Sequence, residues 1–480
     1  MSSIKHNYFY NLFYQIISLL APLITTPYVS RVLGAAGIGE YSFAESIVTY
    51  FTIAAAMGTS TYALREISYS QNDKDRRTFT FWNVFTFRCI LTCICLLFYY
   101  FLFCRVDSSK IYLILAVNIL SVAFDVSWLF QGMENFKVIV IRNTIIKILC
   151  IAFIFTFVKT ESDLLLYVAG YSFSLLLGNI SLWPLIKKYV GFPSNKKIKP
   201  FKDFNVILSL FIPTVAISVY TVLDKTMIGL LTGDSFENGY YEQSLKISRM
   251  TLMVVTALGT VVVPRIGAYV ENNEEERIKQ LMYKSYRFVS FIGIPLCVGL
   301  IGISQNMIPW FLGPGFEKSI PLLCIQSLLI LSIGYNNVTG IQYLIPTKRQ
   351  HLFTKTVIWG CLANLLLNAL LIPFFKSVGA AIASVFAESL IAGLQFYYVK
   401  KEISVKKIVI ESRLYWYSAL LMLTVLLLLN LILVPSFVNS IMMISVGAII
   451  YFLVLILFKE QFTSDYLVGG IKRFLLNKKL

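Results

Sequence analysis

Fourteen long apolar runs, separated by polar segments, constrain the fold of this 480-residue chain more than any other feature. Each run is close to the ~20 residues that an α-helix needs to cross the hydrocarbon core of a bilayer. The runs are continuous, whereas a membrane β-barrel shows alternation over segments of ~10 residues. The sequence therefore predicts an all-α polytopic membrane protein with about 14 transmembrane helices. The runs lie near residues 8–29, 41–64, 81–103, 111–130, 138–158, 164–186, 206–231, 240–263, 286–304, 320–343, 354–372, 378–399, 414–434 and 437–458.

Basic residues predict how these helices are oriented. The chain has 42 Lys and Arg against 25 Asp and Glu, a net charge of +17. With the N-terminus inside, thirty of the 42 fall in inner segments and six in outer segments, as the positive-inside rule requires. Both termini are therefore expected to be cytoplasmic. The excess charge indicates contact with membrane lipids and does not indicate a nucleic-acid partner.

A weak internal repeat predicts the domain organisation. Pro22 in the first run is followed by Gly39 before the second, and Pro213 in the seventh run is followed by Gly239 before the eighth. Six spans separate the copies, so both begin on the same side, as in a parallel repeat. We expect an N-terminal lobe at 1–190, a basic cytoplasmic linker at 191–204, a C-terminal lobe at 205–400, and two last spans with a cytoplasmic tail at 401–480.

Several chemistries are not indicated by the sequence. The longest outer loop, near residues 305–317, is too short to form a catalytic domain for building glycans. There is no GxxxxGK[ST] motif of an ATP-driven pump. The 8 Cys and 2 His lack metal-ligand spacing and predict no structural metal. A transporter without enzymatic activity is the expected class.

Charged residues inside the apolar runs mark the candidate site, because a charge at the bilayer centre costs at least ~2.5–3.5 kcal/mol. Glu242, Lys246 and Arg249 share one face of the eighth span, and Lys225 lies on the span before it. The alternative without a binding role is an ion pair between Glu242 and Lys246, in which the two charges neutralise each other. The functional interpretation is a wet cavity with surplus positive charge that binds an anionic headgroup. The intramembrane charged residues are Glu45, Arg88, Asp125, Asp224, Lys225, Glu242, Lys246, Arg249 and Glu388.

Polar residues on three other spans form a second candidate site. Asn364 and Asn368 share one helical face, and Ser384 and Glu388 share another. Together with Asp224, these residues predict a coupling-ion site for Na⁺ or H⁺, and ordinary interhelical hydrogen bonding is the alternative. Residues near span ends either gate the pathway or snorkel to headgroups: Arg31, Arg65, Glu66, Arg142 and Arg265.

A series of short motifs from the first to the twelfth span gives the chain a family resemblance. It resembles the Wzx-type oligosaccharide flippases of bacterial polysaccharide synthesis, whose superfamily also contains lipid II flippases and multidrug and toxin extruders. The motifs that carry the resemblance are Pro27-Tyr28-Val29-Ser30-Arg31-Val32-Leu33-Gly34, Gly37-Ile38-Gly39-Glu40-Tyr41, Leu64-Arg65-Glu66, Trp128-Leu129-Phe130-Gln131-Gly132, Leu223-Asp224-Lys225-Thr226-Met227-Ile228-Gly229, Gly239-Tyr240-Tyr241-Glu242-Gln243, Lys246-Ile247 and Val263-Pro264-Arg265.

The resemblance implies two six-helix lobes around a central cavity, followed by two peripheral helices. It implies that undecaprenyl-pyrophosphate-linked oligosaccharides are exported across the bacterial inner membrane for O-antigen, capsule or a similar polymer. Polysaccharide polymerase and chain-length proteins are the implied partners, and Na⁺ or H⁺ is the only implied cofactor. Basic cavity residues of the family correspond here to Arg31, Lys225, Lys246 and Arg249.

The resemblance also bears on the coupling ion and on alternative functions. Lipid II flippases hold sodium between helices seven, eleven and twelve, where Asp224, Asn364, Asn368 and Ser384 lie here. Asn368 stands where a carboxylate is expected, which is a departure from that pattern. The alternatives are a multidrug or cation antiporter of the same superfamily, which favours an acidic cavity, and a membrane glycan polymerase, which the short outer loops disfavour.

Overall fold

Helices make up all the regular structure that the computed structural model describes, over residues 4–103, 110–192 and 198–463. Within these ranges ten helices are long and apolar enough to cross a membrane, or eleven if the bent pair α10–α11 is one span. With two crossings in each of α1 and α15, and with α9, the described helices account for all fourteen predicted runs. The predicted fold class, an all-α polytopic membrane protein, is confirmed.

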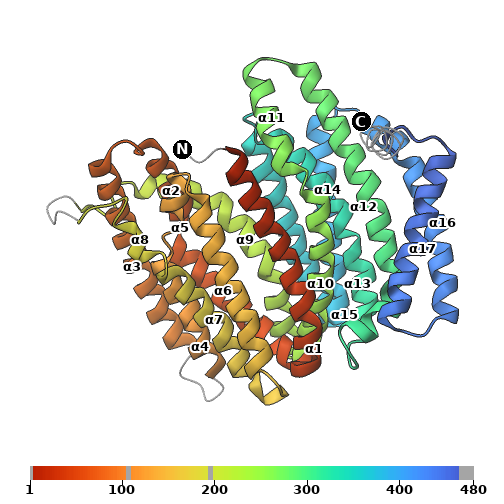
Figure 1. The fold of residues 1–480 in the computed structure, drawn as a ribbon, viewed down its shortest axis with the longest axis horizontal. Coiled ribbons are helices and arrows are strands. Elements are labelled where there is room, and N and C mark those ends of the chain that lie inside the picture. Colours follow the sequence, from red (N-terminus) through yellow and green to blue (C-terminus); the bar gives the residue numbers. More distant parts are fainter. Residues whose placement is uncertain (1–3, 104–109, 193–197, 464–480) are drawn as a thin grey trace, which may run out of the picture. The chain divides into compact units, whose positions relative to one another are not determined.

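The chain divides into two compact units, Met1–Glu242 (unit 1) and Gln243–Leu480 (unit 2), with the boundary inside α10 (Ser235–Thr256). Unit 1 contains α1 (Ile4–Ala56), α2 (Thr59–Tyr69), α3 (Lys74–Phe103), α4 (Lys110–Phe124), α5 (Ser127–Gly132), α6 (Phe136–Phe157), η1 (Glu161–Asp163), α7 (Leu164–Ile180), α8 (Trp183–Ile186), α9 (Phe204–Thr232) and the start of α10 (Figure 1).

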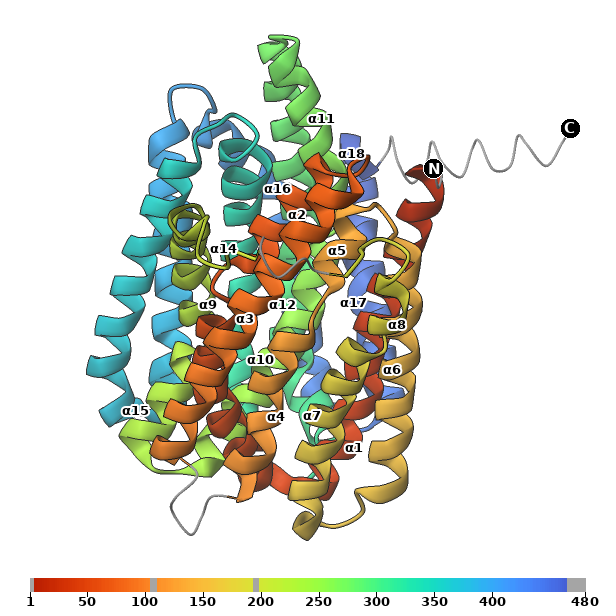
Figure 2. The ribbon, with the colours of Figure 1, turned by 90° about the vertical axis from the view of Figure 1, so that its left-hand side faces the viewer.

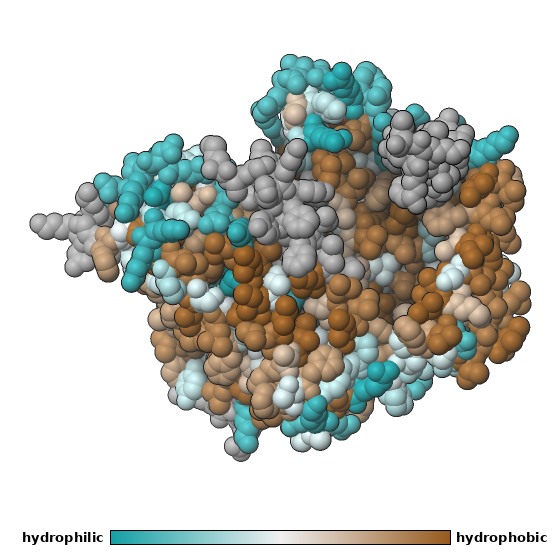
Figure 3. All heavy atoms as spheres, viewed as in Figure 1, coloured by the Kyte–Doolittle hydropathy of each residue, from teal (hydrophilic) through white to brown (hydrophobic). Residues whose placement is uncertain are grey.

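Unit 1 has an aromatic core in two parts. Phe81, Phe87 and Trp128 are buried in one cluster at α2, α3 and α5. Tyr41 and Tyr99 are buried in another cluster, where α1, α3, α4 and α7 meet. Figure 2 shows α2 and α5, which contact each other, at the same end of this unit. Hydrophobic residues cover the middle of the unit 1 helices in Figure 3 and hydrophilic residues gather at their ends, the distribution expected of lipid-facing helices.

Unit 2 is built around the long helix α12, which contacts α11, α13, α14, α16 and α17. The described part of unit 2 contains the rest of α10, α11 (Gly259–Glu271), α12 (Glu275–Phe311), α13 (Ser319–Ser327), α14 (Leu329–Asn336), the π-helical turn η2 (Asn337–Leu344), α15 (Gln350–Val399), α16 (Val405–Ile432), α17 (Phe437–Leu457) and α18 (Gln461–Thr463).

Two of the longest helices each contain a break that separates two predicted spans. A straight helix of 53 residues would be ~80 Å long, far more than the ~30 Å hydrocarbon core. In α1 the break is at Gly34, with φ 64° and ψ 177°, a conformation that glycine adopts at little cost. In α15 it is at Lys376, with φ 50° and ψ −130°. Each break lies between two runs that the sequence predicted as separate crossings.

The predicted domain boundaries stay a prediction. Residues 193–197 of the predicted linker and residues 464–480 of the predicted tail lie outside the described residues. The seventh predicted span, α9, groups with unit 1, because it contacts α1 and α2. The boundary between the compact units, after Glu242, therefore lies further along the chain than the predicted linker at 191–204.

The two copies of the internal repeat meet through their glycines. A Cβ at Gly39 would lie 1.7 Å from the carbonyl oxygen of Ser235, and a Cβ at Gly239 would lie 1.9 Å from that of Ala35. The backbones of α1 and α10 therefore approach so closely that only glycine fits. Ala35 and Ser235 are offset by the same 200 residues as Gly39 and Gly239. Such a reciprocal contact is what a two-fold relation between repeats produces.

Tyr343, Arg349 and Glu402 form a polar cluster near the two ends of α15. This cluster predicts a pH-dependent stability. Arg349 Nη1 lies 2.8 Å from Glu402 Oε1, and the Tyr343 hydroxyl donates to Oε2 of the same carboxylate. Partial burial acts to raise the pKa of Glu402, but the two hydrogen bonds outweigh it, and the pKa is lowered from 4.5. The ionised carboxylate therefore contributes stability above about pH 4.5, and that contribution is lost as the pH falls through the lowered pKa.

We expect the thermal unfolding temperature of the wild-type protein in detergent to exceed that of Glu402→Gln at pH 7. The difference should shrink as the pH is lowered below about 4.5, since both side chains then become neutral. Glu411→Gln is the matched control, because Glu411 is paired only loosely, at 3.9 Å from Lys407. A gap between wild type and Glu402→Gln that stays constant with pH would contradict this assignment.

Candidate functional site

A buried ion-pair cluster joins three helices of unit 1. Lys225 Nζ on α9 lies 2.6 Å from Glu242 Oε2 on α10 and 3.8 Å from Glu45 Oε2 on α1. Lys225 and Glu242 are each 7% exposed. Buried charges are costly unless they are paired, so the ammonium and the carboxylates stabilise one another here. Lys225 is therefore held between two acidic groups, and the predicted surplus positive charge is not found at this residue.

Asp224, next to Lys225 in sequence, makes a different contact. Adjacent helical residues point ~100° apart, and the Tyr241 hydroxyl donates to Asp224 Oδ2 over 2.5 Å. On the neighbouring helix the Tyr41 hydroxyl donates to Glu45 Oε1 over 3.3 Å. Phenol groups therefore stabilise two carboxylates within the spanning part of unit 1. The i,i+4 spacing of Tyr41 and Glu45 is a local signal for their contact, whereas Tyr241 and Asp224 lie on two helices and had no such signal.

The other predicted cationic residues differ in exposure. Lys246 is partly buried and Arg249 is exposed, both on the unit 2 part of α10. Arg31 is exposed on α1, shortly before the break at Gly34. Glu242, the expected pairing partner of Lys246, is engaged by a lysine of α9. The role of these residues in binding substrate stays a prediction.

The residues predicted near span ends are largely engaged at the helix surface. Arg65 donates to Glu66 over 3.3 Å, and Glu66 also pairs with Arg76 at 3.4 Å. Arg142 donates to an amide oxygen of α7 over 3.1 Å. Arg265 is exposed on α11. Their predicted gating role is untouched by these contacts and stays a prediction.

The polar residues predicted to hold a coupling ion form two groups in unit 2. Asn368 Nδ2 donates to Asn364 Oδ1 over 3.0 Å, and both residues are fully buried. Glu388 is buried and accepts from Asn336 Nδ2 over 3.0 Å. Ser384 is buried one turn before Glu388, whereas Asp224 belongs to unit 1. Interhelical hydrogen bonding, the alternative to ion binding, thus occurs at Glu388, and the coupling-ion role stays a prediction.

An amide network extends from Glu388 along the π-helical turn. Gln395 Nε2 donates to Asn336 Oδ1 over 2.7 Å and approaches Thr356 Oγ1 at 3.3 Å. Within η2, Gln342 Nε2 donates to Asn337 Oδ1 over 3.1 Å. π-Helical turns are frequent at functional sites. In the described ranges, no group of three or more His, Cys, Asp or Glu side chains is placed to hold a metal ion.

Arg88 occupies a junction between two broken helices of unit 1. The break between α1 and α2 has positive φ at Met57 and Gly58, and α4 ends before Asp125. The Arg88 guanidinium donates to the Thr59 hydroxyl and, over 2.7 Å, to the backbone oxygen of Asp125. The Asp125 carboxylate lies 3.7 Å away. Arg88 is 1% exposed, and it adds hydrogen bonds to the backbone oxygens of Val122 and Asp125 at the break between α4 and α5.

A cavity of about 400 Å³, which we call the Arg88 cavity, lies beside this junction within unit 1. It is bounded by residues of α1, α2, α3, α4, α7 and α9. Amides and hydroxyls line much of it, including Asn118, Asn179, Ser60 and Thr61. The charges of Arg88 and Asp125 gave the only sequence signal. Neither the breaks nor the cavity had a local pattern that predicts them.

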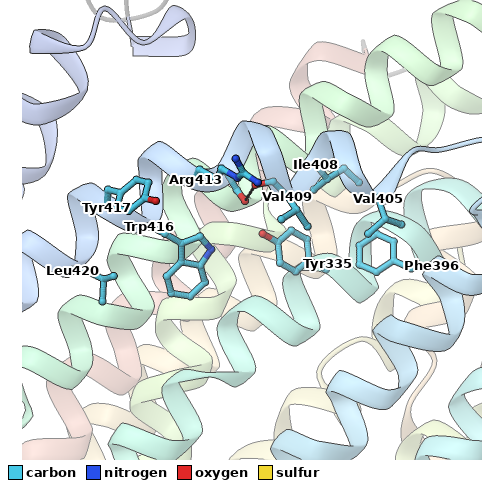
Figure 4. Close-up of a pocket in the computed structure, with 10 residues that line it drawn as sticks. Tyr335, Phe396, Val405, Ile408, Val409, Arg413, Trp416, Tyr417 and Leu420 are labelled. Carbon is cyan, nitrogen blue, oxygen red and sulfur yellow. Dashed lines mark hydrogen bonds between the residues drawn. The ribbon is translucent and has the colours of Figure 1, made fainter.

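A second cavity, the α16 groove, of about 410 Å³, lies within unit 2 along α16. Figure 4 shows Tyr335 and Phe396 facing the side of α16 that carries Val409 and Trp416, with Arg413 nearby. Apolar and aromatic side chains dominate its lining. The groove therefore combines an apolar wall with one guanidinium, a combination that suits an amphiphile.

Two proteins described as putative O-antigen transporters align with most of this chain. It is 26% identical over 407 residues to a putative O-antigen transporter of Escherichia coli (strain K12), an alignment that covers 83% of this chain and 97% of that protein. It is 24% identical over 385 residues to a putative O-antigen transporter of Shigella dysenteriae, covering 78% of this chain and 94% of the relative.

Solved structures show the same fold. The lipid II flippase MurJ in an inward closed conformation matches with a TM-score of 0.75 at 17% identity, covering 95% of this chain and 99% of that one. An inward-facing multidrug resistance MATE transporter of the MOP superfamily matches with a TM-score of 0.60 at 13% identity, covering 81% and 99%. Residues 4–270 match the family described as polysaccharide biosynthesis protein. Because that match covers more than half of the 480 residues, this chain belongs to the polysaccharide biosynthesis protein family.

Proposed function

We propose that this chain is a flippase that moves lipid-linked oligosaccharides across a bacterial inner membrane for surface polysaccharide synthesis, and that it is not an enzyme. The observation that carries the proposal is the similarity to a putative O-antigen transporter over 83% of this chain and 97% of that relative. The MurJ-like fold agrees with it. A multidrug extruder is less favoured, since the extruders match in fold at a lower TM-score.

The side chains of the spanning helices suit a substrate that is both charged and rich in hydroxyl groups. A diphosphate and its sugars cannot enter hydrocarbon without a large desolvation cost, because each unsatisfied polar group costs several kcal/mol there. The spanning helices bury ionised and amide groups such as Arg88, Lys225 and Asn364. The α16 groove offers an apolar wall for a polyprenyl chain. Undecaprenyl pyrophosphate is the lipid carrier that we propose.

Orientation and energy supply belong to the same proposal. We place both termini in the cytoplasm, because the basic residues concentrate in the segments on that side. Na⁺ or H⁺ is the proposed coupling ion, with Glu388 and Asp224 as acidic groups buried in the two units. A polysaccharide polymerase and a chain-length protein are the proposed partners that receive the exported unit.

Neutralising the cations of α10 tests the transport role. We expect Lys246→Gln and Arg249→Gln to lower surface polysaccharide at least tenfold in cells that lack the wild-type copy, because a diphosphate loses a charge-assisted partner. Protein amounts in the membrane should be normal. Lipid-linked oligosaccharide should accumulate in the inner leaflet, as measured by a leaflet-resolved assay.

Arg277→Gln is the matched control, since the Arg277 side chain is 66% exposed and paired with Glu274 on the polar start of α12. This variant should make normal amounts of polysaccharide. Normal amounts of surface polysaccharide in both Lys246→Gln and Arg249→Gln would contradict the proposal that these cations bind the substrate. Accumulation of the oligosaccharide in the outer leaflet would instead identify the protein as a polymerase or ligase.

A further inference from the structure

The Arg88 cavity has the features of a ligand site inside a single unit. Its volume of about 400 Å³ falls within the ~300–1,000 Å³ of typical small-molecule pockets. Ser60 and Thr61 on its rim are exposed, so the cavity opens to the surface of unit 1. Arg88 on its wall is 1% exposed and fixed by hydrogen bonds. The cavity is thus open at one side and rigid at the other.

The charges of the cavity favour a neutral ligand. Arg88 and Asp125 both line it, and their charged groups lie 3.7 Å apart. An anion placed beside the guanidinium would also meet the Asp125 carboxylate, and a cation placed beside that carboxylate would meet Arg88. At contact distance the pair acts as a dipole, which favours a ligand that is neutral overall and has polar groups. Neither a diphosphate nor a cationic drug matches this arrangement.

The polar lining can bind hydroxyl groups. The side-chain oxygen of Asn118 is buried and has no hydrogen-bond partner, although the residue lines the cavity. A buried amide oxygen without a partner is destabilising, and a ligand hydroxyl would satisfy it. Thr61 adds a hydroxyl that both donates and accepts. The backbone N–H groups of Ser60 and Thr61, in the first turn of α2, are further donors.

Apolar residues complete the lining of the Arg88 cavity. Phe211 of α9 and Leu175 of α7 contribute an aromatic ring and an alkyl group to the same cavity. Phe211 contacts Gly58, at the break between α1 and α2, which fixes this wall next to the polar rim. A sugar ring has an apolar face of C–H groups and a rim of hydroxyls. The cavity presents complementary surfaces to both.

We propose that the Arg88 cavity is a subsite for a neutral sugar ring of the transported glycan. This inference rests on the proposed flippase function and adds to it a place of glycan recognition within unit 1. This cavity would select the sugar. Specificity arises because a sugar without the matching hydroxyl leaves the Asn118 oxygen unsatisfied.

Photolabelling of the full-length protein in lipid nanodiscs tests the subsite. The probe is a short polyprenyl pyrophosphate that carries one N-acetylglucosamine with a diazirine on its ring. We expect the label on peptides that contain residues 52–61 or Phe211. Asn118→Leu, which removes the amide at nearly constant volume, should reduce this labelling at least tenfold. Phe211→Ala is a second variant, which perturbs the apolar part of the lining.

Ser209→Ala is the matched control, because Ser209 is exposed on α9 and does not line the cavity. Its labelling should equal that of the wild-type protein, and thermal unfolding should show that all variants are folded. Equal labelling of the cavity by a sugar-free diazirine pyrophosphate would identify an anion site and overturn the proposal. Labelling only elsewhere, or unchanged labelling in Asn118→Leu and Phe211→Ala, would also overturn it.

Transport of the same probe is measured separately in proteoliposomes. If the probe is flipped but does not label the cavity, the sugar subsite is wrong and the flippase function is supported. Probe that labels the cavity but is never flipped supports the subsite and contradicts the proposed transport of this substrate.

Discussion

Replacing Lys225 with methionine is expected to lower the free energy of unfolding by ~3–5 kcal/mol, because it removes the cation of a buried ion pair with Glu242. Glu242 is 7% exposed and lies 2.6 Å from the lysine Nζ. The measurement is equilibrium unfolding of the purified protein in detergent, followed by the helical circular dichroism signal. We also expect loss of transport, since the cluster joins α1, α9 and α10.

A double-mutant cycle separates the ion pair from simple packing. Lys225→Met with Glu242→Gln should recover part of the lost stability, because no charge then remains unpaired between these two positions. Glu45→Gln should cost much less, since Glu45 is partly exposed and 3.8 Å from the ammonium. Equal effects of Glu45→Gln and Glu242→Gln would contradict the geometry, as would an additive double variant.

Alanine at Gly39 or Gly239 is expected to destabilise the protein at or beyond the upper end of the ~1–3 kcal/mol typical of overpacking. The new Cβ would lie 1.7 or 1.9 Å from a backbone carbonyl oxygen, and backbone atoms cannot move aside as a flexible side chain does. α1 and α10 must separate instead. Thermal unfolding and the yield of folded protein measure the effect.

Gly393→Ala is the matched control for these two variants. Gly393 lies inside the long helix α15, and a Cβ there would have open space around it. This variant should be neutral or more stable by up to ~1 kcal/mol, because alanine favours helix more than glycine does. If Gly39→Ala and Gly239→Ala behave like Gly393→Ala, the close approach of the two backbones does not exist in the membrane.

Function depends on the same contacts as stability in this protein. Helix breaks at Gly34 and at Met57–Gly58 leave backbone groups without helical partners, and lipid cannot satisfy them. Arg88 supplies hydrogen bonds at the second break, and the Arg88 cavity lies beside that junction. Discontinuous helices are common at transporter binding sites for this reason. The break that costs stability thus creates the room for a ligand.

Sequence patterns predicted the membrane fold, because hydrophobic length is a local property. Each run of about 20 apolar residues identifies its own crossing, whatever its neighbours do. The repeat of Gly39 and Gly239 was equally visible in the sequence, and the structure brings the two copies into reciprocal contact. The Wzx-like motifs pointed to the polysaccharide biosynthesis family, to which the chain belongs.

Which charges meet was decided by tertiary structure alone. Lys225 pairs with Glu45, 180 residues away, and with Glu242, and helical spacing predicted neither contact. Helical periodicity gives the face on which a residue lies, but the rotation and depth of one helix against another follow from the packing of whole side-chain surfaces. The apolar pattern therefore determined that the chain is a helical protein with many membrane crossings, and long-range packing decided which polar groups are paired and where a cavity is left.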